Sequence, residues 1–373
     1  MTVLSVDERQ QLAQSVRAAC ERLSPEDRVR SVAYDGRQQD RGFDAELWKV
    51  LCTQVGVTAI GLPEELGGAG YGASALAVVA HELGRSLAPV PFVASAVLAT
   101  GLLLETDGAD ARLSALIEGE RTAAAVLTDD GGLWRPENVA VSADGDALTG
   151  VARHVLHGAA ADDLVVIASA GGELAVYAVD AGAPGVSIVE ERVLDGTRPM
   201  ATVTFTDAHA TRLPTEAPVS ELVSRTVDVA ISVLSAEQVG ACERVLEIAT
   251  DYARTREQFN RPIGSFQAVK HKCADMLLDL EWARSASQAA LEAVDDTDES
   301  AWRASMAKAV CSESLRNAAH ANVQIHGGIG FTWEDSAHLY LRRARTDEVL
   351  FGKPAEHWDR LGAKADILCH AHP

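Results

Sequence analysis

The sequence has no excess of positive charge. It holds 33 Lys and Arg residues against 54 Asp and Glu residues, so the formal net charge is −21 with histidine neutral. Binding to nucleic acid or to an anionic membrane surface needs a basic face, which this balance does not provide. Both function classes are therefore excluded. The remaining composition, 47% hydrophobic and 23% charged, is typical of a folded chain rather than a disordered one.

Paired cysteines, metal-ligand spacings and long uncharged runs are also missing. The six cysteines form no CxxC pair and no Cys/His pattern of a metal site. We interpret them as reduced core residues of a cytosolic protein. They are Cys20, Cys52, Cys242, Cys273, Cys311 and Cys369. The N-terminal stretch carries charges throughout, and no run approaches the roughly 20 apolar residues that span a bilayer. We expect no signal peptide, no membrane span, no metal and a cytoplasmic location.

Helical and strand periodicities follow one another along the 373 residues. Apolar residues recur at helical spacing from about residue 6 to 119 and again, more strongly, after Pro218. Between these regions, Leu164–Ile167, Leu174–Val179 and Thr202–Phe205 are short β-type runs. We predict an α+β fold with three domains. They are an N-terminal helical domain at 1–120, a middle β-sheet domain at 121–217 and a C-terminal four-helix-bundle domain at 218–373.

The segment 254–267 combines a helix end, a Pro/Gly turn and a new helix start with Arg, Phe and Gln side chains. The Arg256 guanidinium is suited to pairing with a pyrophosphate, and Phe259 to stacking on a purine. Gln267, near a helix start, is suited to a phosphate or sugar oxygen. The alternative is an ordinary helix hairpin whose arginines are solvated. The spacing of the residues alone favours this alternative.

The segment 324–331 has three glycines within four residues directly after a helix. Such glycines lose conformational entropy on folding, so they indicate positive φ or close approach of the backbone to a flat or anionic group. The spacing differs from the dinucleotide-binding GxGxxG, and a helix rather than a strand precedes it. A helix C-cap is an equally good reading on local grounds.

Taken together, these segments resemble the acyl-CoA dehydrogenase family. The resemblance covers nearly the whole chain. It rests on four features: Arg256-x-x-Phe259 followed by Gln267, Gln324-x-x-Gly-Gly-x-Gly, the early PEELGG stretch at 63–68, and the order of helices, sheet and helices. Either C-terminal motif alone is weak, and their combination is specific.

The resemblance implies a tetramer in which one subunit grips the adenine and pyrophosphate arm of an FAD bound mainly by its neighbour. Carried over to this sequence, the cofactor-binding grip consists of Arg256, Phe259, Phe266, Gln267, Gln324, Gly327 and Gly328. Asn260 stands where the family usually has glycine, a mild departure because Asn also tolerates positive φ. His326 is expected to pack or hydrogen-bond near FAD rather than to catalyse.

The family's catalytic base is missing. The reaction takes a proton from the carbon α to a thioester, which needs a positioned carboxylate. Phe351 occupies the position of the family's glutamate before Gly352, and Ala230 occupies the alternative position on the preceding helix. Neither side chain accepts a proton, so no catalytic residue is assigned. Glu237, Asp347 and Glu348 are the remaining candidates for a displaced base, with an exposed or arginine-paired role favoured.

Two elements of the middle domain that contact flavin in the family are also altered. The Thr-Glu-Pro-x-x-Gly-Ser-Asp stretch is reduced to Thr128–Gly132, and Val155–His157 stands where Trp-Ile-Ser/Thr is usual. With the adenine-binding half intact, the sequence indicates a subunit that lends its grip to another chain's flavin.

The leading hypothesis is a base-lacking subunit of an actinobacterial α2β2 acyl-CoA dehydrogenase that desaturates CoA thioesters of steroid side chains. Its expected partners are a catalytic sister subunit, an acyl-CoA substrate and an electron-transfer flavoprotein. The alternatives are a self-sufficient homotetrameric dehydrogenase with a relocated carboxylate and a non-catalytic acyl-CoA-binding scaffold. A scaffold would have no use for a pyrophosphate cradle, which counts against the last.

Overall fold

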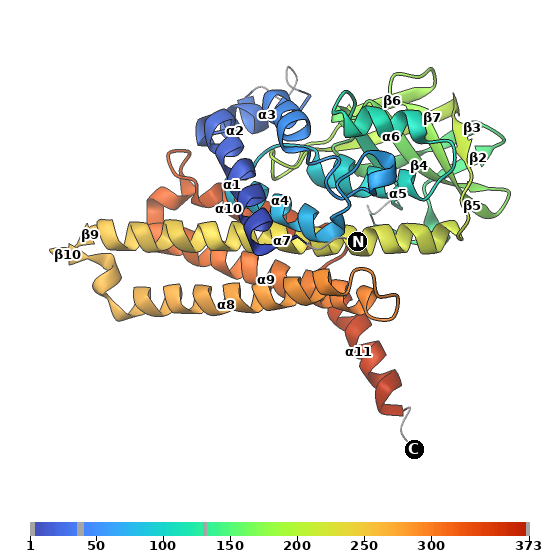
Figure 1. The fold of residues 1–373 in the computed structure, drawn as a ribbon. Helices are drawn as coiled ribbons and strands as arrows, with labels where there is room; N and C mark the ends of the chain where they lie inside the picture. The colour runs from blue at the N-terminus through green and yellow to red at the C-terminus, as the bar shows by residue number, and fades with distance from the viewer. Residues whose placement is uncertain (1–3, 36–40, 130–132, 371–373) are drawn as a thin grey trace. The chain divides into compact units, whose positions relative to one another are not determined.

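The structure is a computed structural model that describes residues 4–35, 41–129 and 133–370, with side chains described as far as residue 365. The chain divides into two compact units. The first comprises Met1–Leu76 and Ala88–Ala230, and the second comprises Ala77–Leu87 and Ile231–Pro373. Each unit is described by itself (Figure 1).

Short helices make up the N-terminal part of the first unit. They are α1 (Val6–Leu23), α2 (Glu26–Arg30), α3 (Ala45–Val50), α4 (Gly72–Ser86, whose later turns belong to the second unit), α5 (Thr100–Leu104) and α6 (Asp110–Ile117). A capping box starts α1, because Ser5 Oγ accepts from the Glu8 amide and Glu8 Oε2 accepts from the Ser5 amide at 2.9 Å. In the PEELGG stretch, a Cβ on Gly68 would lie 2.2 Å from the Leu62 carbonyl oxygen, so this turn requires glycine.

One mixed sheet forms the rest of the first unit. Its strands are β1 (Ala123–Val126), β2 (Val141–Asp144), β3 (Ala147–Leu156), β4 (Asp163–Ala170), β5 (Glu173–Asp180), β6 (Val186–Glu190), β7 (Met200–His209) and β8 (Thr211–Leu213). The strand order is β6-β7-β3-β2-β4-β5-β8, with β1 paired in parallel to β4. Alternating side chains of β7, among them Val203 and Phe205, are buried in the sheet's apolar core.

Long helices form the second unit. They are α7 (Val219–Thr255, whose first turns belong to the first unit), α8 (Gln267–Glu292), α9 (Ser300–His326), α10 (Ala337–Val349) and α11 (Pro354–His370). A hairpin of two very short strands, β9 (Glu257–Gln258) and β10 (Arg261–Pro262), joins α7 to α8 and is seen at one end of these two helices in Figure 1. Buried small residues along α9, such as Ala304, Ala307 and Ala318, let neighbouring helices approach closely.

The predicted fold class is confirmed: helices, a middle sheet and long C-terminal helices follow in that order. The predicted runs Leu164–Ile167, Leu174–Val179 and Thr202–Phe205 all lie within strands. The domain boundaries at residues 120 and 217 stay predictions. The five cysteines that the structure describes are free, and all except the half-buried Cys273 are buried; the Cys369 side chain lies outside the described part.

Candidate functional site

Between α7 and α8 the structure has the helix end, turn and new helix start that the sequence predicts, and a β-hairpin that it does not predict. Gln258 pairs with Arg261 across the hairpin, and both residues between them have positive φ, 55° at Phe259 and 59° at Asn260. This is the arrangement of a type I′ turn, in which asparagine is well tolerated. Phe259 is therefore held at the tip, with its ring 86% exposed and edge-on to Phe266 at a centroid distance of 6.1 Å.

Polar side chains of the predicted grip surround this turn. The Arg256 amide donates to the Tyr252 carbonyl at 2.9 Å, while its guanidinium is exposed and has no hydrogen bond or ion pair with any residue that the structure describes. Gln267 is the first residue of α8 and is exposed, with Nε2 3.4 Å from His271 Nε2. The Arg261 guanidinium lies 4.0 Å from the centre of the Phe266 ring.

The glycine-rich segment follows the last turn of α9. Gly327 has a φ of 64°, and a Cβ built on Gly327 or Gly328 would meet no atom within 4 Å. The backbone there is open rather than packed. His326, just before it, is buried, stacks on Tyr252 at 4.1 Å and places Nδ1 2.9 Å from the Asn322 carbonyl oxygen. This is the expected packing role of His326, and it joins the end of α9 to the end of α7.

A hydrogen bond between α8 and α9 also connects the two predicted segments. Lys272 Nζ donates to Gln324 Oε1 at 2.5 Å across 52 residues of sequence. The sequence reasoning missed Lys272, because only the packing of α8 on α9 shows which residue faces Gln324. The structure thus gathers the ends of α7 and α9 and the start of α8, which carry all seven predicted grip residues.

The chemistry of this donor set fits the arm of FAD. Arg256 supplies an exposed guanidinium, Gln267 and Gln324 supply carboxamides, and Gly327 and Gly328 supply open backbone, all suited to phosphate and sugar oxygens. Phe259 supplies an exposed aromatic face suited to a flat ring. The assignment of these residues to FAD binding stays a prediction.

Neither base position carries a proton acceptor. Ala230, on α7, is fully buried. Phe351, just after α10, has a φ of 59°, and its carbonyl lies 3.0 Å from His357 Nε2. Burial lowers the pKa of His357 to about 4, so the ring is neutral and its Nε2–H donates. The turn that carries Phe351 is held by its backbone and by His357.

The candidate carboxylates for a displaced base are engaged elsewhere. Glu237 is buried in an ion pair with Arg343, which is also buried. Glu348 accepts from Arg316 at 2.7 Å and is paired with Arg345 at 2.5 Å. Of the exposed or arginine-paired role that the sequence favours, Glu237 and Glu348 have the arginine-paired form, and Glu237 and Asp347 are not exposed, at 5% and 1%.

A buried lysine beside these carboxylates escaped the sequence reasoning. Lys308, on α9, donates to Ser312 Oγ at 3.0 Å and to the Glu348 carbonyl at 3.3 Å. Burial lowers its pKa to about 8 against the opposing attraction of Asp347 and Glu348. The available signal was its place on the apolar helical stripe that also holds Cys311.

The altered middle-domain elements pack into the first unit. Val155 is buried in the core of the sheet. His157 is buried with a φ of 52°, and its amide donates to the Pro199 carbonyl at 2.8 Å. Thr128 donates through Oγ1 to the Arg153 carbonyl at 3.2 Å. Asp130, Gly131 and Gly132 of the same stretch lie outside the described residues.

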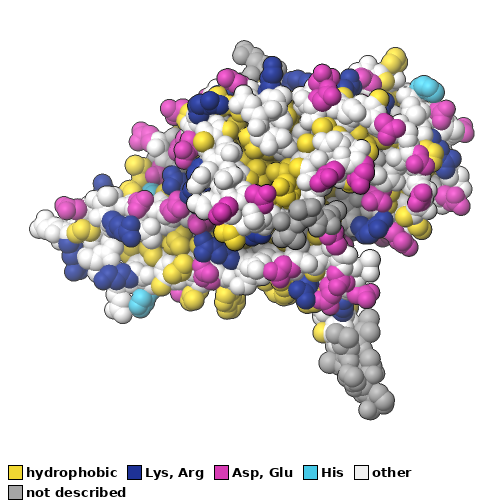
Figure 2. Space-filling view, in the orientation of Figure 1, with side chains coloured by type: hydrophobic (Ala, Val, Ile, Leu, Met, Phe, Trp, Pro, Cys, Tyr) yellow, Lys and Arg dark blue, Asp and Glu magenta, His cyan; other side chains and the backbone are white. Residues whose placement is uncertain are grey.

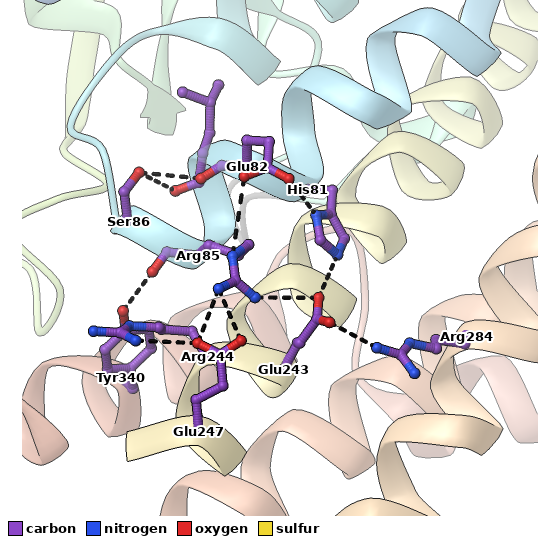
Figure 3. Close-up of polar contacts among 10 residues, drawn as sticks. His81, Glu82, Arg85, Ser86, Glu243, Arg244, Glu247, Arg284 and Tyr340 are labelled. Atoms are coloured by element: carbon purple, nitrogen blue, oxygen red, sulfur yellow. Dashed lines mark hydrogen bonds and ion pairs between the residues drawn. The ribbon is translucent and has the colours of Figure 1, made fainter. Parts of the chain in front are cut away.

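A network of charged side chains ties α4 to the long helices of the second unit (Figure 3). Its members are His81, Glu82 and Arg85 of α4, Glu243, Arg244 and Glu247 of α7, Arg284 of α8 and Tyr340 of α10. The hydrogen bond from His81 and the neighbouring arginines lower the pKa of Glu243 to about 2. Burial opposes the charge of His81, but hydrogen bonds to Glu243 and Glu82 outweigh it and raise the pKa.

Close backbone contact accompanies this network. A Cβ on Gly84 would lie 2.0 Å from the Glu237 carbonyl oxygen, and a Cβ on Gly240 would lie 2.0 Å from the His81 carbonyl oxygen. Both glycines are therefore required where α4 crosses α7. In the described part of the chain, this network included, no group of three or more His, Cys, Asp or Glu side chains is placed to bind a metal ion. No helix in that part combines the length and apolar character needed to cross a bilayer.

The chain is similar to known proteins over nearly its whole length. Two family models match the chain, the acyl-CoA dehydrogenase N-terminal domain at residues 6–113 and the acyl-CoA dehydrogenase C-terminal domain at residues 222–365. Acyl-CoA dehydrogenase IpdE2 of Mycobacterium tuberculosis is 33% identical over 356 residues, which cover 95% of this chain and 96% of the relative.

Two similar solved structures each carry the names of two proteins. A variant of the Tcur3481-Tcur3483 steroid ACAD has a TM-score of 0.85 at 30% identity and covers 98% of each chain. The ChsE4-ChsE5 complex from Mycobacterium tuberculosis has a TM-score of 0.85 at 29% identity, covering 98% of this chain and 99% of the other.

Proposed function

Because the chain belongs to the acyl-CoA dehydrogenase family, we propose that it is a subunit of a heteromeric acyl-CoA dehydrogenase that completes the FAD site of a catalytic sister subunit. Members of this family are FAD-dependent oxidoreductases. The reaction proposed for the complex is α,β-desaturation of a CoA thioester. A steroid side chain is the proposed acyl group, on the strength of the similarity to a steroid ACAD.

The single observation that carries the proposal is the loss of both base positions beside an intact grip. Phe351 and Ala230 cannot take the α proton, whereas Arg256, Gln267 and Gln324 keep the donors that suit a pyrophosphate arm. Chain-to-chain completion of a cofactor site explains why one half is retained without the other.

In the proposed complex the residues of this chain bind and orient. Arg256 would pair with a phosphate oxygen, and the carboxamides of Gln267 and Gln324 would hydrogen-bond the arm. Gly327 and Gly328 would let the arm lie against the backbone, and Phe259 would cover the adenine. When bound, FAD supplies the acceptor for the hydride that leaves the β carbon. The α proton is taken by a carboxylate of the sister subunit.

The surface of the second unit supports assembly with another protein. Leu277, Leu278 and Trp282 on α8 are 48%, 60% and 69% exposed. Leu278 and Trp282 are four residues apart and lie on the same face of α8, and exposed large apolar side chains that lie together are typical of a protein interface. Figure 2 shows hydrophobic side chains at the surface where α8 runs in Figure 1. We propose that the sister subunit covers this face, and that an electron-transfer flavoprotein reoxidises the assembled enzyme.

The relocated-base alternative has less support. Glu237 and Glu348 are already paired with arginines, and Asp347 is buried beside the Lys308 ammonium. A carboxylate held as an anion by a neighbouring cation is a weak base, because the cation lowers its proton affinity.

The test is to purify the chain alone and together with its co-produced sister subunit, and to measure FAD content and acyl-CoA turnover. We expect little FAD and no turnover from the chain alone, and one FAD for each pair of chains with turnover from the complex. Stoichiometric FAD with turnover by the isolated chain would instead establish a self-sufficient enzyme. A stable complex without flavin would favour the scaffold.

A further inference from the structure

We infer that Lys272 is a positioning residue of the cofactor grip, which fixes the Gln324 carboxamide so that its N–H donors face the bound phosphates. This inference rests on the proposed function. The juxtaposition behind it is the 2.5 Å contact between Lys272 Nζ on α8 and Gln324 Oε1 on α9.

The chemistry of the two groups sets the orientation of the amide. An ammonium has three donors and no acceptor, so only the carboxamide oxygen can face it. The two ends of a glutamine amide look alike in shape, and only a partner of this kind distinguishes them. Lys272 therefore engages the acceptor of Gln324 and leaves the NH₂ group pointing away from it.

The NH₂ group of Gln324 lies where a ligand has room. Gln324 is exposed, and no acceptor for its Nε2 is found among the described residues. It precedes Gly327 by one helical turn, and the space over Gly327 and Gly328 is open. Two N–H donors beside open backbone suit an anionic oxygen, whereas a carboxamide turned the other way would present its own oxygen and repel it.

Gln267 shows the opposite arrangement at the same end of α8. Its Nε2 lies 3.4 Å from His271 Nε2, so in the structure the amide nitrogen faces the ring and the oxygen points outward, an orientation that requires the neutral His271 tautomer whose Nε2 accepts. The outward groups of the two glutamines therefore differ, donors from Gln324 and an acceptor from Gln267. An acceptor suits a ribose hydroxyl or the adenine amino group, and donors suit a phosphate.

The variants that test this are Lys272→Met, which removes the cation, and Lys272→Arg, which keeps it. Lys270→Met is the matched control, because Lys270 is exposed on the same turn of α8 and makes the same change of charge. Gln324→Ala and the double variant Lys272→Met/Gln324→Ala complete a double-mutant cycle. All are made in the complex with the sister subunit, and the dissociation constant of FAD is measured by equilibrium dialysis.

We expect Lys272→Met to weaken FAD binding about five- to tenfold, as for loss of a coupled polar partner, and Lys272→Arg to stay within about twofold of the native complex. In the Gln324→Ala background, Lys272→Met should have no further effect. Equal losses in both backgrounds would mean that Lys272 acts on its own and would overturn the inference. So would a loss from Lys270→Met as large as that from Lys272→Met.

A second readout needs no partner. The side-chain amide resonance of Gln324, followed by NMR in the isolated chain, should shift on Lys272→Met and stay in place on Lys270→Met. An unmoved resonance would overturn the inference.

Arg256→Ala separates failure of the inference from failure of the proposed function. Release of FAD by Arg256→Ala with no effect of Lys272→Met would refute only the role of Lys272. FAD retained in both variants would refute the grip and the inference with it.

Discussion

Replacing Glu243 by glutamine removes the anion at the centre of the network in Figure 3 without changing the size of the side chain. The carboxylate contacts His81 Nε2 at 3.0 Å, Arg85 Nη1 at 3.2 Å and Arg284 Nη2 at 2.8 Å. With His81 protonated, the change leaves three cations facing a neutral amide. We expect α4 to lose much of its attachment to α7 and α8.

The magnitude follows from the pKa of Glu243. A fall from 4.5 to about 2 corresponds to about 3 kcal/mol of stabilisation for the ionised group. Because the side chain is 28% exposed, screening by solvent reduces this to about 2 kcal/mol. The contribution is present above pH 4.5 and is lost as the pH falls from there towards 2.

His81 sets the other limit of the pH range. Its pKa is raised, so its share of the stabilisation is complete below 6.5 and is lost as the pH rises through the folded-state value. The difference between the native chain and Glu243→Gln should therefore be largest near pH 6 and become smaller towards pH 9. It should not vanish there, because Arg85 and Arg284 keep their charge.

Native-state hydrogen exchange with mass spectrometry measures this locally, because it reports the opening free energy of peptides from α4 and α7. Glu281→Gln is the matched control. Glu281 is 54% exposed and contacts Arg284 at 2.5 Å, so its loss should cost below about 0.5 kcal/mol. Equal protection in the two variants at pH 6 would refute the central role of Glu243, and a pH-independent difference would refute the charged state of His81.

Three further outcomes follow from the site and the helix crossing. Arg256→Ala should weaken FAD binding in the complex by about one to two decades, as a charge-assisted phosphate contact is worth about 1.5–3 kcal/mol; unchanged retention on gel filtration would make the motif structural only. Phe351→Glu should leave turnover per FAD essentially unchanged, and a doubling would show a complete site in this chain. Gly240→Ala should destabilise the second unit by about 1–3 kcal/mol or more in urea unfolding, because its Cβ meets the His81 carbonyl at 2.0 Å. Gly362→Ala, with no atom within 4 Å, is the control and should be neutral or stabilising.

Periodicity was sufficient to predict the order of helices and strands, because burial of one face imposes it locally. The turn between α7 and α8 was partly predictable from residue type. Asn260 tolerates a positive φ, and the structure has 59° there. The positive φ of Phe259 could not be foreseen, since phenylalanine does not favour this region and only the pairing of β9 with β10 imposes it.

Features that depend on contacts between distant segments were missed. Lys272 meets Gln324 only because α8 packs on α9, and His81 meets Glu243 only because α4 crosses α7. The crossing depends on Gly84 and Gly240, which lie inside helices. From the sequence alone, a glycine inside a helix is only a residue that lowers helix stability. Their purpose becomes visible once the opposing carbonyl oxygens are placed.

At the turn that carries Phe351, the backbone conformation is held by neighbouring residues. Phe351 adopts a φ of 59°, which is unfavourable for a bulky residue. The His357 ring donates to the Phe351 carbonyl at 3.0 Å, and a Cβ on Gly352 would lie 3.1 Å from His357 Nε2, so the turn and the ring fit closely around a glycine. Gly352 and His357 thus hold this turn through its backbone, and neither of these contacts involves the side chain at position 351. Under the proposed function, a carboxylate and a phenylalanine at this position are therefore compatible with the same turn, so that the base could be given up without a rearrangement of the backbone.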